Sequence, residues 1–411
     1  MIFLLETFLC LFFVIPAVLV CLYHLFLAGI GLFLSKKPRF QETQTVHFAI
    51  LIPAHDEHGV IEQTLQSCLQ LDYPKDLLDI YVIADNCSDD TAEIARSFGV
   101  NCFERQSETE KGKGYALAWA FPKILAESKC DAVLVLDADC IIDSHALKSF
   151  DYRITQSPSK ETCFQLNYVV GNPDTSPLSY LLATANYLEN DSFYAPMSAL
   201  GLPVLLRGTG MVIPRSVLER NPWNAFSIVE DTEYTLQLIK RGINVQFVQE
   251  TKILSEFPSE QKTLTAQRSR WIGGNLGFCV AEGFRFIGSG LVTLSVKKIN
   301  TGWTLLLLSR PLILFHLLLT TVLALVWTLL MQNTECMLNS PCLFSSVIAC
   351  WIGYFIYFVL GVWGLGFTQK RFFHLVRIPF SLLGYLSMSV GSILSKKPQQ
   401  WTKTPRSGME T

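Results

Sequence analysis

Two aspartates separated by one residue form the first group of side chains in this sequence that could bind a metal ion and a ligand together. Asp137 and Asp139, in LDADC, end an apolar run over residues 132–139. This spacing lets one carboxylate bind a divalent cation while its neighbour reaches a bound ligand. Carboxylate oxygens are hard ligands that suit Mg²⁺ or Mn²⁺ bridging phosphates. Acidic pairs are common on protein surfaces, so the pair alone is a weak signal, but its position after a buried strand strengthens it.

A second acidic pair, Glu230 and Asp231, stands at the start of an amphipathic pattern in SIVEDTEYTLQLIKRG. The simplest interpretation is that Asp231 or Thr232 caps a helix and that the acids interact favourably with its dipole. Without its context in the chain, this pair would carry no further meaning.

Two basic groups could bind phosphate. In QRSRW (267–271), Arg268 and Arg270 could hold a diphosphate bidentately and Trp271 could stack on a sugar ring, although a basic, aromatic membrane-interface anchor is an equally good interpretation. KGKGYAL (111–117) places lysines and glycines at a helix start, where backbone N–H groups favour phosphate. Its spacing does not match the P-loop, which argues against an ATPase.

Histidines and cysteines do not point to a metal centre. His55 and His58 lie near the first predicted strand, but oxygen ligation is the expected chemistry and hydrated loop histidines explain them better. The 12 cysteines show no CxxC pairs and no Cys/His metal spacing, which argues against a zinc site and a disulfide scaffold. A net charge of −2 provides no basic field for nucleic acid.

The elements that position these groups read as alternating strands and helices. The predicted strands cover 47–53, 79–85 and 132–139, and the predicted helices 62–71, 89–98 and 114–127. Near-continuous apolar strands that alternate with helices predict a mostly parallel sheet covered on both faces, an α/β fold. The polar clusters at 55–58, 85–90 and 137–140 all follow strands, and ligands of such sheets bind at the carboxyl ends of strands.

Composition places part of the chain in lipid. Of 411 residues 50% are hydrophobic and only 17% charged, and the mean hydropathy is +0.32. No charged residue occurs between Glu6 and Lys36, which predicts a transmembrane helix that is not a cleaved signal peptide. The stretches 303–331 and 336–369 predict a two-helix hairpin. Basic residues after position 35 predict that residues 37–302 and the tail are cytosolic.

These features divide the chain into five regions. The stretch 378–394 has basic residues on both sides and modest length, which favours an interfacial or re-entrant helix over a fourth span. We therefore predict an N-terminal transmembrane helix over 1–36, a cytosolic catalytic domain over 46–260, interfacial helices over 261–302, a transmembrane hairpin over 303–369, and an interfacial helix with a cytosolic tail over 370–411.

Taken in chain order, these motifs resemble the membrane-bound family 2 glycosyltransferases, the group that includes the cellulose and hyaluronan synthases. The resemblance covers about 220 residues and rests on IPAHDE (52–57), VIADNCSDDT (82–91), KGKGYAL (111–117), LDADC (136–140), GTGM (208–211), VEDTEYTL (229–236) and QRSRW (267–271). It implies a GT-A fold, plus transmembrane and interfacial helices.

The resemblance also implies a role for each matching residue. Asp231 would be the general base, with Glu230 beside it, and Gly208 and Trp271 would line the acceptor site. Asp137 and Asp139 would bind nucleotide and metal, Mg²⁺ or Mn²⁺. The residues implied to bind the nucleotide sugar are Glu57, Asp85, Lys113, Asp137, Asp139, Gln267, Arg268 and Arg270. The chain departs from the family at 84–87, where ADNC replaces the frequent DDGS, so Ala84 lacks a carboxylate and the nucleoside contacts there are in doubt.

The function implied is an inverting glycosyltransferase that moves a sugar from a nucleotide sugar to a lipid-linked or membrane-proximal glycan acceptor. A UDP-linked donor and a bacterial-type plasma membrane are expected. Three spans provide little material to enclose a glycan channel, which favours one or a few transfers over a processive polysaccharide synthase, the main alternative. A catalytically inactive membrane scaffold is a weaker alternative. The sequence does not specify the sugar, the acceptor or the oligomeric state.

Overall fold

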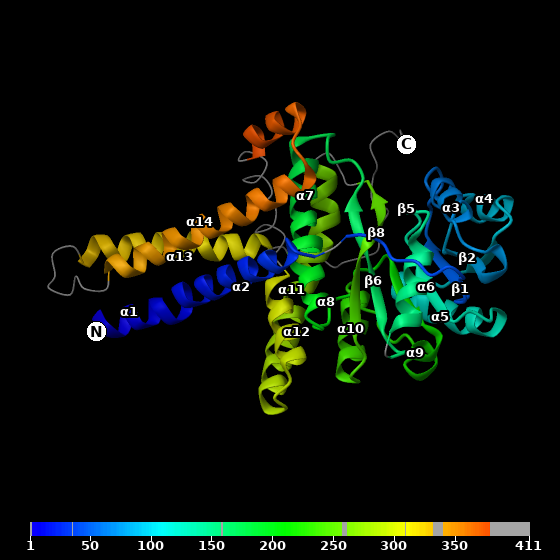
Figure 1. The fold of residues 1–411 in the computed structure, drawn as a ribbon, viewed down its shortest axis with the longest axis horizontal. Helices are drawn as coiled ribbons and strands as arrows, with labels where there is room; N and C mark the ends of the chain where they lie inside the picture. Colours follow the sequence, from blue (N-terminus) through cyan, green and yellow to red (C-terminus); the bar gives the residue numbers. More distant parts are fainter. Residues whose placement is uncertain are drawn as a thin grey trace.

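The computed structural model describes residues 2–34, 36–157, 159–256, 261–308, 310–331 and 340–378. Its centre is an eight-stranded sheet in the order β3-β2-β1-β4-β7-β6-β8-β5 (Figure 1). The strands are β1 Phe48–Ala54, β2 Leu78–Asp85, β3 Asn101–Arg105, β4 Ala132–Val135, β5 Cys140–Ile142, β6 Cys163–Val170, β7 Met211–Pro214 and β8 Val245–Ser255.

The sheet is parallel in its first half and mixed in its second. Strands β3, β2, β1 and β4 run parallel, as predicted. Strand β7 is antiparallel to both β4 and β6, β5 is antiparallel to β8, and β6 pairs with β8 in parallel. The prediction of a mostly parallel sheet therefore describes the N-terminal half best, whereas the C-terminal half mixes parallel and antiparallel pairs.

Helices cover both faces of the sheet. Alternate residues of the fully buried strand β1 belong to two different cores: Ala49 and Leu51 to one, Phe48, Ile50 and Ile52 to the other. The first core includes side chains of α5 (Lys113–Glu127) and α10 (Glu230–Lys240), and the second those of α3 (Ile61–Leu69) and α6 (Ala146–Gln156). The remaining short elements of this domain are η2 Lys75–Leu77, α4 Thr91–Ser97 and α9 Arg215–Arg220.

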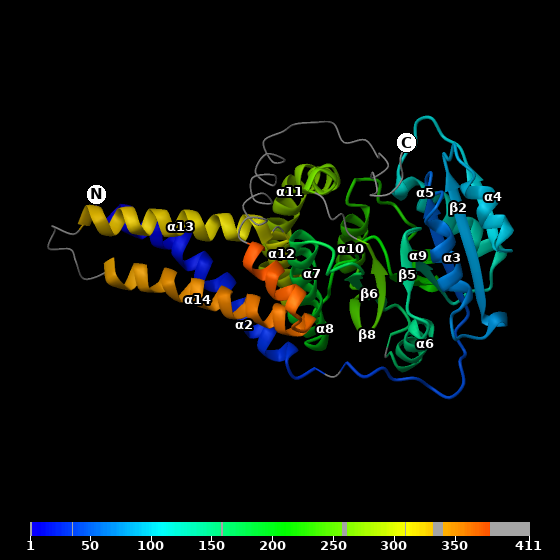
Figure 2. The same cartoon turned by 90° about the horizontal axis from the view of Figure 1, so that it is seen from above.

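Three helices of the described chain are long and apolar enough to cross a membrane, over Leu4–Gly31, Leu312–Leu330 and Leu343–Leu365. They agree in number with the three predicted spans, and each lies within its predicted stretch. The elements that contain them are α1 Ile2–Leu9, the π-turn η1 Cys10–Val14, α2 Ile15–Gly31, α13 Arg310–Met331 and α14 Ser340–Leu365. They run side by side away from the sheet (Figures 1 and 2).

A layer of crosswise helices separates the spans from the sheet (Figures 1 and 2). It consists of α7 Pro177–Glu189, the π-turn η3 Asn190–Tyr194, α8 Ala195–Ala199, α11 Gln261–Val292 and α12 Val296–Leu307. The second predicted span was placed too early: residues 303–307 belong to α12, and a new helix starts at Arg310. Pro311 explains the break, because proline is tolerated in the first turn of a helix but not in its interior.

The chain continues beyond α14 into a short helix over 369–378, where Arg371 forms an ion pair with Asp174 (2.7 Å). Residues 379–411 lie outside the described part of the chain. The predicted interfacial helix over 378–394 lies almost entirely within residues 379–411, so it stays a prediction.

Candidate active site

The predicted site residues of the parallel half lie where its strands end. Asp85 is the last residue of β2, and Asp137 and Asp139 follow β4, which pairs in parallel with β1. Carboxyl ends of parallel strands meet at one edge of a sheet, which is where such folds bind ligands. Asp137 and Asp139 are both half-exposed, whereas Ala138 between them is buried. The two carboxylates therefore remain accessible to a ligand.

Lys113 connects this edge to the acidic pair. It is the first residue of α5, after Gly112 whose φ of 123° requires glycine. Its ammonium contacts the Asp137 carboxylate and donates to the Gly208 carbonyl at 2.8 Å. Burial lowers the pKa of Lys113, but the carboxylates of Asp137, Glu230 and Asp231 outweigh burial and raise it overall. Lys113 is therefore the cation of an otherwise acidic site.

The loop before β7 completes the arrangement. Gly208 has φ of 78°, and a side-chain carbon there would lie 3.5 Å from Asp231 Oδ2 and 3.6 Å from Lys113 Nζ. The Asp137 N–H donates to the Thr209 hydroxyl (3.0 Å), and the Gly210 N–H to the Val135 carbonyl (2.8 Å). The structure thus brings Lys113, Asp137, Gly208 and Asp231, which are far apart in the sequence, to one place.

Glu230 and Asp231 open α10, but neither caps it. The N-cap position is Val229, without a side-chain hydrogen bond, so the capping interpretation of these acids is wrong. The Asp231 carboxylate accepts from the Thr232 N–H at 2.5 Å. Burial and the neighbouring Asp231 charge together raise the pKa of Glu230 to about 8, and burial raises the pKa of Asp231. Lys113 opposes both shifts. Burial therefore disfavours two negative charges side by side in this pair, and nearby positive charge favours the ionised forms.

The charge balance and the donor set fit a divalent cation. Asp137 and Asp139 offer oxygen ligands on alternate residues, and the four carboxyl groups of Asp137, Asp139, Glu230 and Asp231 outnumber the cations Lys113 and Arg207. A cation at Asp137 and Asp139 would offset this excess. A second cluster, Asp56, Cys87 and Asp89, has ligating atoms within 4.8 Å of one another. Its carboxylates already accept from loop N–H groups, Asp56 from Ser88 (2.6 Å), so that cluster stabilises the loops after β1 and β2.

Among the residues implied to bind the nucleotide sugar whose side chains the structure describes, only Asp85 has a buried atom without a hydrogen-bond partner. Its Oδ1 accepts from Arg105 Nη1 at 2.6 Å, whereas Oδ2 is buried without a hydrogen-bond partner among the described residues. Arg105 is itself buried and donates to Glu110 (3.1 Å). Glu57 lies nearby in the loop after β1, with its N–H donated to the Thr91 hydroxyl (2.9 Å).

The two histidines of this region take part in loop contacts. His55 Nδ1 hydrogen-bonds the Asp85 carbonyl (2.7 Å), and the exposed His58 contacts Asp90 (2.5 Å). The potential metal-binding group found among the described residues contains neither histidine.

Sequence reasoning missed Arg207, which precedes Gly208. Its guanidinium donates to Asn190 (2.6 Å) and Glu189 (3.2 Å) and lies over the rings of Tyr168 and Tyr194, at 5.7 and 5.6 Å. The positive charge of Arg207 also lowers the pKa of Asp231, which burial raises. The only signal in the sequence was a lone arginine inside the apolar stretch LPVLLRGTGMVI.

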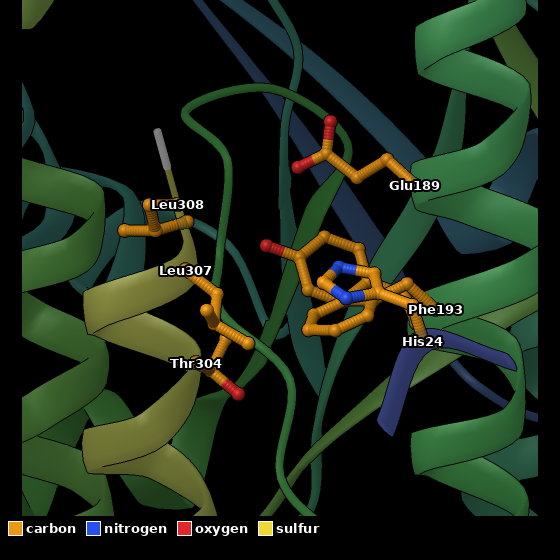
Figure 3. Close-up of a pocket in the computed structure, with 7 residues that line it drawn as sticks. His24, Glu189, Phe193, Thr304, Leu307 and Leu308 are labelled. Atoms are coloured by element: carbon orange, nitrogen blue, oxygen red, sulfur yellow. The ribbon is translucent and has the colours of Figure 1, made fainter. Parts of the chain in front are cut away.

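A small cavity lies beside Arg207, between the site and the spans (Figure 3). Glu189 points into it from α7, the stacked rings of His24 and Phe193 (5.5 Å) form one side, and Leu307 and Leu308 form the other. Tyr194 and Thr304 complete its lining. Arg207, whose charge acts on Asp231 and whose guanidinium donates to Glu189, therefore connects the acid pair to a cavity that His24 of the first span also lines.

The motif residues Gln267, Arg268, Arg270 and Trp271 lie on α11. The side chains of this helix are described only from Gly277 onward, so the predicted diphosphate contacts of this motif lie outside the description and stay predictions.

Comparisons with known proteins agree with this architecture. Residues 45–274 match the family model described as "Glycosyltransferase like family 2". The chain is 30% identical over 274 residues to a probable glycosyltransferase, YdaM, of Bacillus subtilis, covering 62% of this chain and 63% of that protein. It is 26% identical over 258 residues to a poly-β-1,6-N-acetyl-D-glucosamine synthase of Staphylococcus aureus, covering 62% and 60%. The chain thus aligns with about three fifths of these relatives' lengths.

Among solved structures, the fold is similar to that of a mannosyltransferase from Pyrobaculum calidifontis solved with GDP-Man and Mn²⁺. The TM-score is 0.56, with 15% sequence identity, and the match covers 94% of this chain and 96% of that one. At this identity the match supports the fold alone, an α/β GT-A domain with attached helices. Because the family model spans more than half of the 411 residues and the architecture agrees, the chain belongs to glycosyltransferase family 2.

Proposed function

We propose that this protein is an inverting hexosyltransferase that moves a sugar from a UDP-linked donor to a lipid-linked or membrane-proximal glycan acceptor. The observation that carries the proposal is the convergence of Lys113, Asp137 and Asp231 around Gly208. A donor diphosphate, a cation and an acceptor base all require positions within reach of one another, and this convergence supplies them.

In the proposed reaction, a hydroxyl of the acceptor attacks the anomeric carbon in line with the departing diphosphate. Asp231 accepts the hydroxyl proton: the Thr232 N–H, Lys113 and Arg207 all favour its ionised form and oppose the burial that raises its pKa. Glu230 orients the acceptor. Lys113 stabilises negative charge on the donor side of Gly208. One displacement with no covalent enzyme intermediate gives inversion.

Asp137 and Asp139 would hold Mg²⁺ or Mn²⁺. The cation, when bound, would neutralise charge on the leaving diphosphate. Arg270 and Gln267 are proposed to contact the same diphosphate from α11, and Trp271 the acceptor. Their roles rest on the motif match.

The preference for UDP rests on Asp85. Its Oδ2 is buried without a partner, and leaving a buried acceptor unpaired is costly. A uracil ring offers one N–H between two carbonyl oxygens. This pattern matches the one unpaired carboxylate oxygen of Asp85 next to the Arg105 donor. Guanine presents adjacent N–H donors, and Arg105 already occupies Oδ1, the second acceptor they would need. Edge contacts of this kind distinguish unstacked bases.

The proposed membrane location rests on the three apolar helices and on the cavity that His24 of the first span lines together with Glu189. We propose that the catalytic domain faces the cytosol of a bacterial-type plasma membrane. A lipid-linked acceptor could then approach the acid pair without leaving the bilayer surface. Membrane lipids are thus expected partners, whereas a net charge of −2 gives no support to nucleic-acid binding.

A processive polysaccharide synthase is the second candidate, since a relative at 26% identity is named as a synthase of a polymer. The test for both is one experiment. Detergent-purified protein is incubated with a panel of UDP- and GDP-sugars and lipid extract, and the products are measured by mass spectrometry. We expect UDP release and lipid products one or a few sugars heavier. A long ladder of products would favour the polymer synthase, and no product with any donor would contradict both.

A further inference from the structure

The small cavity beside Arg207 contains a carboxylate that the proposed reaction does not use. Glu189, the last residue of α7, points into this cavity (Figure 3). Its side chain is 26% exposed, whereas the lining residues His24, Phe193 and Thr304 are buried. Placing a charged group among buried neighbours is costly, and ligand pockets typically combine apolar walls with a few polar groups of this kind. This carboxylate is therefore a candidate ligand-binding group.

A short series of contacts links Glu189 to the proposed base. Its Oε2 accepts from Arg207 Nη2 at 3.2 Å. Arg207 directly precedes Gly208, where an added side-chain carbon would lie 3.5 Å from Asp231 Oδ2, and the charge of Arg207 acts on Asp231. An acceptor whose reacting hydroxyl lies at Asp231 can therefore extend a second polar group to Glu189.

The cavity offers little positive charge to an anionic ligand. The guanidinium of Arg207 already donates to Asn190 (2.6 Å) as well as to Glu189, and it lies over the rings of Tyr168 and Tyr194. None of the described lining residues is a lysine or an arginine. Phosphate groups in proteins are usually held by arginine, lysine or a series of backbone N–H groups. The cavity does not suit a phosphate.

The size of the cavity favours a hydroxyl group over a phosphate. Its free space is about 10 Å³, which is roughly the room that one water molecule needs. A single hydroxyl fits this space, whereas a phosphate with its several oxygens is larger. A hydroxyl also donates the hydrogen bond that the Glu189 carboxylate accepts, and bonds to a charged acceptor are the stronger ones.

The rest of the lining is largely apolar and includes an element that spans the membrane. Leu307 and Leu308, at the end of α12, form one side of the cavity. Phe193 and His24 form the other with their stacked rings (5.5 Å), and His24 belongs to the first span. These residues suit the apolar part of a lipid, while Glu189 faces its polar headgroup.

We propose that Glu189 binds a hydroxyl group of the acceptor headgroup, and that the acceptor is a neutral glycolipid with no phosphate in this position. This inference rests on the proposed function and narrows the class of its acceptor. Glu189 would be an acceptor-binding residue, distinct from the base. A headgroup held there by one hydroxyl presents another to Asp231, and the negative charge of Glu189 repels an anionic headgroup.

The first test measures lipid binding without sugar transfer. Full-length protein in detergent is mixed with equal amounts of glucosyl dioleoylglycerol, which is neutral, and dioleoylglycerol phosphate, which has the same chains. Native mass spectrometry then counts each bound lipid. We expect wild type to retain the neutral lipid preferentially and Glu189→Gln, which keeps the side-chain shape, to lose this preference. Equal retention or a preference for the phosphate lipid in wild type would overturn the proposal.

The matched control for this test is Glu219→Gln. Glu219 also pairs with an arginine, Arg215 (2.7 Å), but it lies on α9 in the catalytic domain. Its replacement should leave the lipid preference of wild type unchanged. A preference that survives in Glu189→Gln as fully as in Glu219→Gln would overturn the assignment of Glu189.

A second test separates binding by Glu189 from an indirect effect through Arg207. With glucosyl dioleoylglycerol as acceptor, Glu189→Gln should raise the acceptor KM about tenfold and leave the donor KM unchanged. A fall in kcat with no change in acceptor KM would show that Glu189 only positions Arg207, and would overturn the proposal. If no donor gave transfer but lipid preference still depended on Glu189, the proposed function would fail while the headgroup site would be supported.

Discussion

Replacing Asp231 by asparagine tests the proposed base with little disturbance of the structure. The Asp231 carboxylate accepts from the Thr232 N–H, and an amide oxygen can accept the same bond. The Asp231 main-chain carbonyl accepts from the Thr235 hydroxyl (2.7 Å), and the substitution leaves that bond unchanged. Removing one negative charge also relieves repulsion with Glu230, whose pKa this charge raises. We therefore expect Asp231→Asn to fold and to keep its thermal stability.

The same change should abolish most of the transfer activity. An amide cannot accept the acceptor proton, and loss of a general base typically costs ~10² to 10⁴-fold in rate, or about 3–5 kcal/mol of transition-state stabilisation. Donor affinity should change little, because the donor contacts proposed here lie on Lys113, Asp137 and Asp139. Glu230→Gln should reduce the rate less, since its proposed part is orientation.

The assay measures transfer of radiolabelled sugar to lipid, beside donor binding by calorimetry, for wild type and both variants. Near-normal transfer by Asp231→Asn would refute the base assignment. A loss of donor affinity as large as the loss of rate would also refute it, because the carboxylate would then act in binding the donor.

Three further predictions concern the metal, the catalytic domain and the membrane topology. Chelation should remove UDP release, and Asp139→Ala should abolish metal-dependent nucleotide binding, measured by calorimetry. Arg153→Gln should lower the melting temperature at pH 7, and by less and less as the pH falls below the ordinary glutamate value of about 4.3: burial raises the pKa of Glu250, yet Arg153 outweighs burial and holds it below the usual value, so this stabilisation disappears as the carboxylate is protonated. A membrane-impermeant thiol reagent should label Cys336 from outside but not a cysteine placed at Ser407.

Each of these three predictions has an outcome that would contradict it, and the stability prediction also has a control variant. Full activity in excess chelator would exclude the metal role. Arg96→Gln is the control for Arg153→Gln, because the Arg96 pair with Glu104 lies on the exposed surface and should not affect stability. A stability loss in Arg153→Gln that persists at low pH would contradict the ion-pair explanation. Labelling of position 407 from outside would require a fourth span within 378–394.

The sequence predicted the parts of the fold that depend on local pattern. The apolar run before His55 became β1, and polar residues after the runs marked the sheet edge correctly. The antiparallel strand β7 escaped prediction, because MVIP alone does not specify its direction and its pairing with β4 depends on register.

Long-range pairing explains the site residues that were missed. Arg207 and Arg105 contact residues 17 or more positions away, Asn190 and Asp85, and no local pattern encodes such pairs. By contrast, Asp137 and Asp231 were found because the family motif preserves them in order. Their meeting around Gly208 still required the structure, since it depends on how the loop before β7 folds.

In the proposed reaction, Asp231 acts as a base in a single displacement of UDP from an α-linked donor. The most direct test is the anomeric configuration of the newly formed linkage, determined by proton NMR on product made from an α-linked UDP-sugar. We expect a β-linkage together with release of one UDP per sugar transferred. An α-linkage would contradict the single displacement and the role assigned to Asp231.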